Sequence, residues 1–145
     1  NWQRVPTLEE ALDVAGRAVG MILELKVEGI GNEACAIVKR TGFPGPLIYA
    51  SFLMPELQRV RQTDPDAKIM VLQHRRLPPD PVADVVALDA SHVGLHFSTV
   101  TPMLLQTYHN LGRQVFVYTV NESQDIQRMR NLGVDGIISD FPDRI

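Results

Sequence analysis

The sequence predicts an α/β protein in which helices cover a parallel β-sheet. Short apolar runs rich in β-branched residues alternate along the chain with segments of helical period. The apolar runs recur at intervals of about 20–25 residues, and the turns between segments are short and polar. Such alternation is typical of βαβ units, and the lack of a Ser/Gly-rich linker favours a single domain over residues 1–145.

Each expected strand is a short apolar run bounded by turn residues, which is typical of strands buried in a parallel sheet. Roughly six such runs occur, at residues 21–27, 46–52, 68–73, 93–97, 114–120 and 136–141.

The expected helices are marked by their start and stop signals. Thr7 and Glu10 have the spacing of a capping box, and Pro102 follows a capping threonine at a first helical position. Gly42 and Gly133 are expected to end their helices. The segment 80–90 suits a short helix, although 85–88 (VVAL) also suits a strand. The expected helices cover residues 8–19, 32–42, 54–65, 80–90, 101–112 and 123–133.

Composition excludes several classes of function. The chain has 17 acidic and 14 basic residues, a net charge of -3, and no basic block beyond the short HRR at 74–76, so nucleic acid is not an expected partner. No apolar run reaches the ~20 residues that a transmembrane helix requires. The single cysteine, Cys35, lies among apolar helix formers and is expected to be a buried, inert thiol.

Two sheet architectures compete at this length. An open, doubly wound sheet suits a chain of 145 residues, whereas a closed (β/α)₈ barrel requires eight strands and about 250 residues. Length therefore favours the open sheet. Nucleotide-binding open sheets, however, carry a glycine-rich first turn, and the only short candidate here is GIG at 29–31.

The strand MILELKV carries two charged residues, Glu24 and Lys26, which alternation places on one face together with Ile22. In a barrel that face points inward, and its C-terminal end opens at the mouth where active sites lie. One interpretation is a Glu–Lys pair whose charges satisfy each other. The other makes Glu24 an oxygen ligand for a divalent cation and Lys26 a contact for an anionic substrate.

Five motifs occur in a characteristic order: VPTLEEAL, LELK, SF, VYTVNE and LGVDGIISDFPDRI. Together they resemble the later two-thirds of a glycerophosphodiester phosphodiesterase, over Val5 to Ile145. The resemblance implies a TIM (β/α)₈ barrel that hydrolyses glycerophosphodiesters to an alcohol and glycerol 3-phosphate with a bound divalent cation, Ca²⁺ or Mg²⁺. It also implies a role in lipid and glycerol metabolism.

The resemblance assigns roles to four residues by motif. Glu24 corresponds to a metal-binding carboxylate and Lys26 to a lysine beside the substrate phosphate. Phe52 would line the barrel mouth, and Tyr118 would form an aromatic wall where the family usually has tryptophan. Asn121 suits substrate contact, loop shaping or helix capping.

The chain also departs from the family pattern. The His-Arg-Gly, Glu-Asn-Thr, Glu-x-Asp and His-Asp motifs are absent, so no catalytic residue of the family is expected in this chain. Structural or surface roles are expected for its histidines, His74, His92, His96 and His109. We therefore expect a partial TIM (β/α)₈ barrel that lacks about the first two βα units, with preceding sequence missing because no initiator Met is present.

The expected function is that of a phosphoric diester hydrolase in the complete barrel, with negligible activity in this chain alone. One alternative is a non-catalytic remnant that binds a phosphorylated ligand, or a partner chain through its open sheet edges. Another is a different phosphate-handling barrel enzyme that makes no demand on glycerol. A cytoplasmic location is the expectation for the protein.

Overall fold

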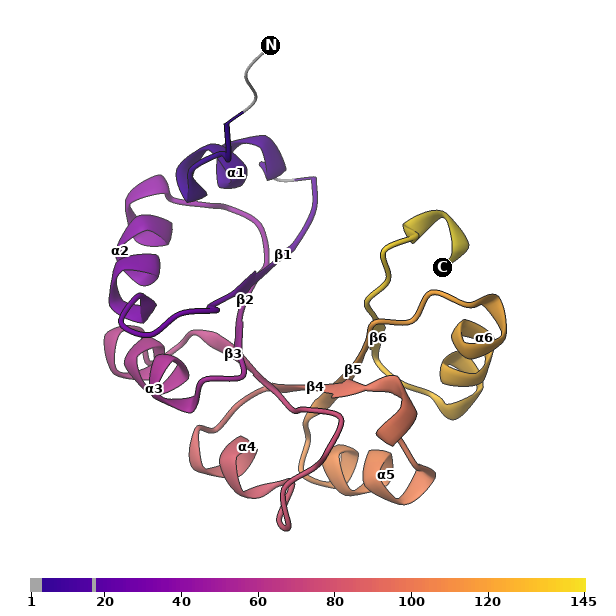
Figure 1. Cartoon of the computed structure of the whole chain (residues 1–145). Coiled ribbons are helices and arrows are strands. Elements are labelled where there is room, and N and C mark those ends of the chain that lie inside the picture. Colours follow the sequence, from indigo (N-terminus) through magenta and orange to yellow (C-terminus); the bar gives the residue numbers. More distant parts are fainter. Residues whose placement is uncertain (1–3, 17) are drawn as a thin grey trace. The chain divides into compact units, whose positions relative to one another are not determined.

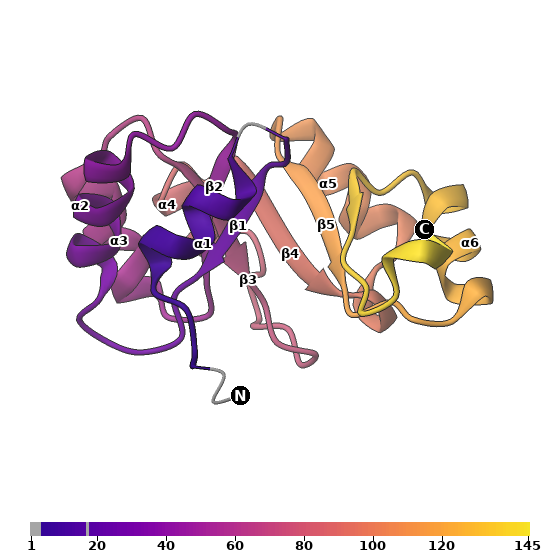
Figure 2. The same cartoon turned by 90° about the horizontal axis from the view of Figure 1, so that it is seen from above.

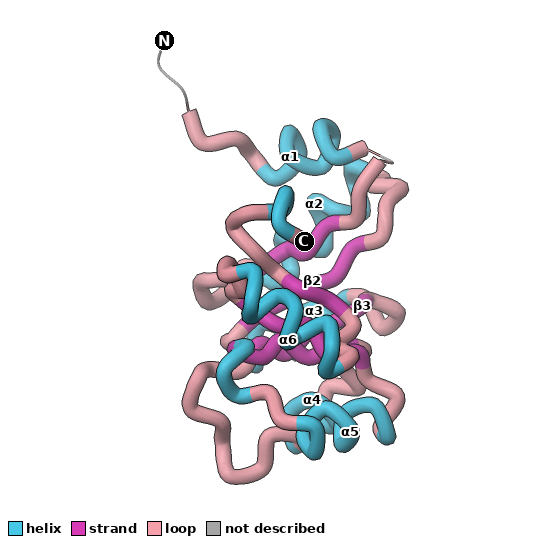
Figure 3. The backbone as a smooth tube through the Cα atoms, turned by 90° about the vertical axis from the view of Figure 1, so that its right-hand side faces the viewer, coloured by secondary structure: helices cyan, strands magenta, loops and turns pink. Residues whose placement is uncertain are grey.

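The computed structural model describes residues 4–16 and 18–145. The chain divides into two compact units, Asn1–Ala67 and Lys68–Ile145, which are described in turn (Figure 1). The single domain expected over 1–145 stays a prediction. Figure 3 shows strands (magenta) and helices (cyan) following one another along the chain.

The first unit contains two parallel strands, with Glu24 opposite Ala50 in the register. Helices α2 and α3 lie side by side next to these strands (Figure 1). In chain order its elements are α1 (Leu8–Ala15), β1 (Met21–Glu24), α2 (Gly31–Thr41), β2 (Leu47–Ser51) and α3 (Met54–Thr63).

Local signals in the sequence set most helix ends in this unit. The Thr7 hydroxyl and the Glu10 carboxylate form the predicted capping box at the start of α1. Gly42 ends α2 in the left-handed conformation, at φ 61°. Cys35 is buried on α2, as predicted.

The second unit contains four parallel strands in the order β3-β4-β5-β6. Figure 2 shows β4 and β5 side by side. The segment at 80–90 forms a helix rather than a strand. The elements are β3 (Lys68–Leu72), α4 (Ala83–Ala87), β4 (His92–His96), a 3₁₀ turn (Phe97–Thr99), α5 (Pro102–Asn110), β5 (Gln114–Tyr118), α6 (Ser123–Leu132), β6 (Gly136–Ile137) and a second 3₁₀ turn (Pro142–Arg144).

The two faces of this four-stranded sheet differ. One face is mostly buried and aliphatic; it includes Val93, Leu95, Val115 and Val117, each 0% exposed. The opposite face carries larger and polar side chains, and the register places His96 beside Tyr118 there. This face thus carries polar groups at both ends, with His96 and Tyr118 at its C-terminal end.

Most elements end earlier than the sequence predicts, and α1, β1 and β6 are among those that end three or more residues early. Helix α1 stops at Ala15, before Val19, because Gly16 takes a positive φ of 54°. Strand β1 stops at Glu24 rather than residue 27, because the next carbonyl bonds a side-chain hydroxyl instead of a strand amide. Strand β6 stops at Ile137 rather than residue 141, and the Asn121 side chain binds the amide of Asp140 beyond it.

Because β1 is shorter than predicted, the burial of Val27 differs from that expected within a strand. In a strand over residues 21–27, alternation would place Val27 on the same face as Leu25, where both can pack on helices. Leu25 is 1% exposed, as expected, but Val27 is 58% exposed because it lies beyond the end of the strand. Among the described residues, no helix has the length and apolar character needed to cross a bilayer.

Candidate functional site

Glu24 and Lys26 lie at the C-terminal end of β1, where they form an ion pair with Lys26 Nζ 2.9 Å from Glu24 Oε2. The Glu24 side chain is 31% exposed and that of Lys26 is 73% exposed. Ion pairs this open to water contribute only about 0–1 kcal/mol. A substrate anion could therefore take the place of the carboxylate beside Lys26 at little energetic cost.

Phe52 follows the C-terminal end of β2, which is paired with β1, and its side chain is half-buried. Because the strands are parallel, their C-terminal ends meet at one edge of the sheet. Glu24, Lys26 and Phe52 thus come from adjacent segments at this edge, as the resemblance requires. Their binding roles stay predictions.

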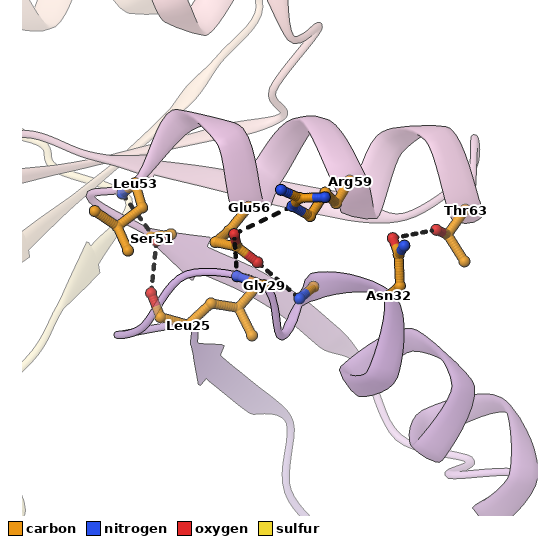
Figure 4. Close-up of polar contacts among 9 residues, drawn as sticks. Leu25, Gly29, Asn32, Ser51, Leu53, Glu56, Arg59 and Thr63 are labelled. Atoms are coloured by element: carbon orange, nitrogen blue, oxygen red, sulfur yellow. Dashed lines mark hydrogen bonds and ion pairs between the residues drawn. The ribbon is translucent and has the colours of Figure 1, made fainter.

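The last residue of β2, Ser51, is completely buried and makes two hydrogen bonds (Figure 4). Its hydroxyl donates to the carbonyl oxygen of Leu25 at 2.6 Å and accepts from the amide of Leu53 at 2.9 Å. Leu25 lies between Glu24 and Lys26, so Ser51 connects the backbone of the ion pair to that of Phe52.

Glu56, in the first turn of α3, is a second buried polar residue here, at 0% exposure. Its carboxylate accepts from the amides of Gly29 at 2.7 Å and Gly31 at 2.8 Å (Figure 4). Burial alone would raise the pKa of this carboxyl, but the two amides and the Arg59 guanidinium outweigh burial and lower the pKa. Glu56 is therefore an ionised structural group at neutral pH.

Tyr118 lies in the second unit, at the C-terminal end of β5. Its hydroxyl donates to the carbonyl oxygen of Gln73, just after β3. Its ring packs edge-on against His96 at the end of β4, with centroids 6.0 Å apart. An aromatic group is thus in place at the predicted position, held by residues at the ends of neighbouring strands.

His96 is a polar neighbour of Tyr118 that the motif analysis did not select. Its Nδ1 accepts from the amide of Ser98 at 3.2 Å, and its ring stacks on Phe97. Burial, together with the positive charge of Arg75, lowers the pKa of His96 below the ordinary 6.5. The imidazole is therefore neutral at pH 7, with its proton on Nε2 because Nδ1 is an acceptor.

The structural or surface roles predicted for the remaining histidines stay predictions, and the structure gives the surroundings of each. His92 is buried at the start of β4, where its Nδ1 lies 2.8 Å from the Ser91 hydroxyl. His109, near the end of α5, lies 2.8 Å from the carboxylate of Asp135. His74 is exposed in the loop after β3.

Asn121 shapes the loop after β6. Its side-chain oxygen accepts from the amide of Asp140 at 3.0 Å and from the hydroxyl of Ser139 at 3.2 Å, and its side-chain amide donates to the Asp140 carboxylate at 2.9 Å. It does not cap α6, which begins after Glu122 without a side-chain cap. Of the three roles open to Asn121, these contacts match loop shaping.

The described residues do not by themselves make a complete cation site. Glu24 supplies one carboxylate, already paired with Lys26, and no group of three or more potential ligands gathers within the described part of the chain. Calcium and magnesium each take about six or more oxygen ligands, some of them from water. Glu24 can therefore serve as one ligand of such an ion.

Sequence reasoning missed Ser51 and Glu56, although both are buried and polar. Ser51 belongs to the SF motif, and a serine that ends an apolar strand signals a hydroxyl in need of a buried partner. Glu56 carried no such signal, because an acidic residue in a first helical turn is ordinary and exposed in most proteins.

Comparisons with known proteins agree with the motif analysis. The glycerophosphoryl diester phosphodiesterase family matches residues 1–144. A glycerophosphodiester phosphodiesterase of Caldanaerobacter subterraneus subsp. tengcongensis is 28% identical over 149 residues, which cover 99% of this chain and 61% of that protein. One of Bacillus subtilis (strain 168) is 25% identical over 97% of this chain and 52% of its own length. The chain thus spans less than two-thirds of the length of each of these two relatives.

Solved structures show the same relationship. An Oleispira antarctica phosphodiesterase in complex with the product sn-glycerol-3-phosphate superposes with a TM-score of 0.85 and 26% identity, over 97% of this chain and 59% of that one. A glycerophosphodiester phosphodiesterase of Parabacteroides distasonis superposes with a TM-score of 0.79 and 25% identity, over 95% and 61%. The predicted fold class, a partial (β/α)₈ barrel, is confirmed. The chain belongs to the glycerophosphoryl diester phosphodiesterase family.

Proposed function

We propose that the protein containing this chain hydrolyses glycerophosphodiesters to sn-glycerol 3-phosphate and an alcohol. The family match over residues 1–144 supports this reaction. The observation that carries the proposal is the exposed Glu24–Lys26 pair at the C-terminal end of β1, where barrel enzymes of this class place their chemistry.

Lys26 is proposed to bind a non-bridging oxygen of the phosphodiester. An ammonium group is a compact donor that suits phosphate, and the one on Lys26 is exposed on a short loop. Charge stabilisation of this kind is worth most when negative charge builds up on the phosphoryl oxygens during water attack. Phe52 and Tyr118 are proposed to pack against the glycerol or the leaving alcohol.

In the proposed reaction, the oxygen of water forms a bond to phosphorus and the bond from phosphorus to the alcohol oxygen breaks. The water loses one proton and the alcohol leaves with one. Positioned acid–base groups contribute about 10²–10⁴-fold to such a step, and the histidine motifs of the family do not occur in this sequence. We therefore propose that the chain alone has negligible activity.

Glu24 is further proposed as one oxygen ligand of a divalent cation, Ca²⁺ or Mg²⁺. A carboxylate is the ligand type that both ions prefer. The other ligands would come from water or from further protein groups, since no cluster of three potential ligands forms among the described residues.

Hydrolysis assays test this function. The protein expressed from the complete reading frame should release sn-glycerol 3-phosphate from glycerophosphocholine, and far less phosphate from simple monoesters. Lys26→Ala should reduce kcat/KM by about 10²-fold, the effect expected when one electrostatic contact to the transition state is lost. An exposed lysine on α2, Lys39, provides the control substitution Lys39→Ala, which should have no effect.

The outcomes separate the alternatives. Binding of sn-glycerol 3-phosphate without hydrolysis of any diester would contradict the enzyme proposal and support a non-catalytic phosphate-binding remnant. Equal turnover of monoesters and glycerophosphodiesters would support another phosphate-handling enzyme. A stable dimer of the pure chain in light scattering would support association through sheet edges.

The cytoplasmic location and the role in lipid and glycerol metabolism are also proposals, supported by the family resemblance alone. Fractionation of cells that express a tagged protein from the complete reading frame tests the location. Recovery of the tag in the medium or an envelope fraction would contradict it.

A further inference from the structure

The loop from Leu25 to Gly31, which carries Lys26, is held at both ends by buried side chains (Figure 4). Ser51 holds its beginning and Glu56 holds its end. Ser51 is the last residue of β2 and Glu56 lies in the first turn of α3, so both belong to the first unit.

At the beginning of the loop, Leu25 is fixed in three ways. Its amide donates to the carbonyl of Ala50 at 2.8 Å, which continues the β1–β2 ladder. Its carbonyl accepts from the Ser51 hydroxyl at 2.6 Å, and its side chain is 1% exposed. With the backbone of Leu25 fixed, the directions of Glu24 before it and Lys26 after it are fixed as well.

The same hydroxyl also orients Phe52. It accepts from the amide of Leu53 at 2.9 Å, so the backbone on both sides of Phe52 is held by Ser51. One buried hydroxyl thus connects three of the four residues proposed to bind the cation or the substrate.

At the end of the loop, the Glu56 carboxylate binds the amides of Gly29 and Gly31, at 2.7 and 2.8 Å. Gly31 is the first residue of α2, so a negative charge there also complements the helix dipole. A Cβ atom at Gly31 would lie 2.9 Å from the Glu56 carbonyl oxygen and 3.0 Å from Arg59 Cβ. This close packing leaves the loop end little room to shift.

We propose that Ser51 and Glu56 are positioning residues that set the geometry of the Glu24–Lys26 pair for substrate binding. The inference rests on the proposed function and names the residues that hold the substrate-binding pair in place. A strand is extended by hydrogen bonds between backbone groups alone. Here the carbonyl of Leu25 instead accepts from the Ser51 hydroxyl, in place of a backbone amide of the neighbouring strand. The chain therefore leaves the strand at Lys26, whose ammonium group stays exposed while its backbone remains held.

The test measures kinetics and binding in the protein expressed from the complete reading frame. Ser51→Ala should lower kcat/KM for glycerophosphocholine by about 10–100-fold, because small misplacements of binding groups have effects of that size. It should weaken binding of sn-glycerol 3-phosphate, measured by calorimetry, and Glu56→Gln should do the same. Ser51→Thr, which keeps a hydroxyl, should recover most of the affinity.

A matched control separates positioning from lost stability. Thr101→Ala removes another hydrogen bond between a side-chain hydroxyl and the backbone, in which the hydroxyl accepts from the amide of Leu104 at the start of α5. It should lower the melting temperature and leave kcat/KM within about twofold of the wild type. In the double variant Ser51→Ala/Lys26→Ala, the loss of affinity should be smaller than the sum of the two single losses, because non-additivity identifies residues that act through one another.

The outcomes distinguish this inference from the proposed function. Wild-type hydrolysis combined with unchanged kinetics and affinity in Ser51→Ala and Glu56→Gln would overturn the inference alone. Additive losses in the double variant would also overturn it. A wild-type protein that neither binds sn-glycerol 3-phosphate nor hydrolyses its diesters would overturn the proposed function, and this inference with it.

Discussion

Among single residues, Glu56 shows most clearly how a buried charge is stabilised. Two backbone amides and the Arg59 guanidinium surround its carboxylate, and none of the side chain is exposed. Replacing the carboxylate by a neutral amide leaves one of the two backbone donors without an acceptor oxygen, which costs about 1–3 kcal/mol when the donor is buried. Glu56 therefore contributes to folding as well as to the proposed loop geometry.

We predict that Glu56→Gln lowers the free energy of unfolding at pH 7 by about 1–3 kcal/mol. The folded-state pKa of Glu56 lies below the ordinary value of 4.5, so its ionised form stabilises the fold above that value. This contribution is lost as the pH falls through the folded pKa. Urea denaturation from pH 7 to pH 3 should therefore show the difference between wild type and variant shrinking toward acid. Glu28→Gln, at an exposed position in the same loop, is the control, and equal effects of the two changes would contradict the prediction.

At the scale of helices and strands, Gly136 shows why a side chain is excluded from β6. A Cβ atom there would lie 2.7 Å from the ring of Phe116 on the neighbouring strand β5. Contacts this short force side chains or backbone to move, which costs about 1–3 kcal/mol in packed regions. The ring of Phe116 and the missing side chain of Gly136 are thus complementary.

We predict that Gly136→Ala destabilises the protein by about 1–3 kcal/mol, measured by urea denaturation. Because the clash is with a ring, Phe116→Leu in the same chain should recover part of the loss. The contradicting result is a double variant whose free energy of unfolding equals the value obtained by adding the effects of the two single changes. That result would show that the ring is not the cause of the destabilisation.

The sequence predicted the order of the helices and strands and the type of nearly all of them, because these depend on local periodicity and capping residues; it did not predict the two 3₁₀ turns. Thr7, Gly42, Pro102 and Gly133 lie at or beside the helix ends that they were expected to mark. The end of β1 was wrong because Ser51, 26 residues away in the chain, determines it. Long-range side-chain contacts of this kind leave no local pattern.

The candidate site was predicted to a similar extent. Motif order selected Glu24, Lys26, Phe52 and Tyr118, and the structure places each at the C-terminal end of a strand or just after it. It did not select Ser51, Glu56 or His96, whose surroundings depend on strand register and on burial. Residues that support a site are harder to identify from a sequence than charged residues within an apolar strand.

At the scale of the whole molecule, the important fact is how much of each known relative's length this chain matches. The family match covers residues 1–144, while the chain spans 61% of the Caldanaerobacter relative and 59% of the Oleispira structure. The activity of the whole protein therefore stays a proposal, supported by the family match and by the Glu24–Lys26 pair.

We predict that removing divalent cations with a chelator abolishes hydrolysis by the complete protein, and that added Ca²⁺ or Mg²⁺ restores it. Glu24→Gln should raise the cation concentration needed for half-maximal activity, because a carboxylate ligand becomes a neutral amide. Glu33→Gln, at an exposed position on α2, is the control. Full activity in the presence of chelator would contradict the cation proposal and leave the role of Lys26 untouched.

The most direct test is a crystal structure of the complete protein with sn-glycerol 3-phosphate. The account predicts a phosphate oxygen within about 3 Å of Lys26 Nζ, the distance of a charged hydrogen bond, with the Leu25–Ser51 hydrogen bond intact. A phosphate bound elsewhere, with Lys26 still paired to Glu24 at 2.9 Å, would contradict it.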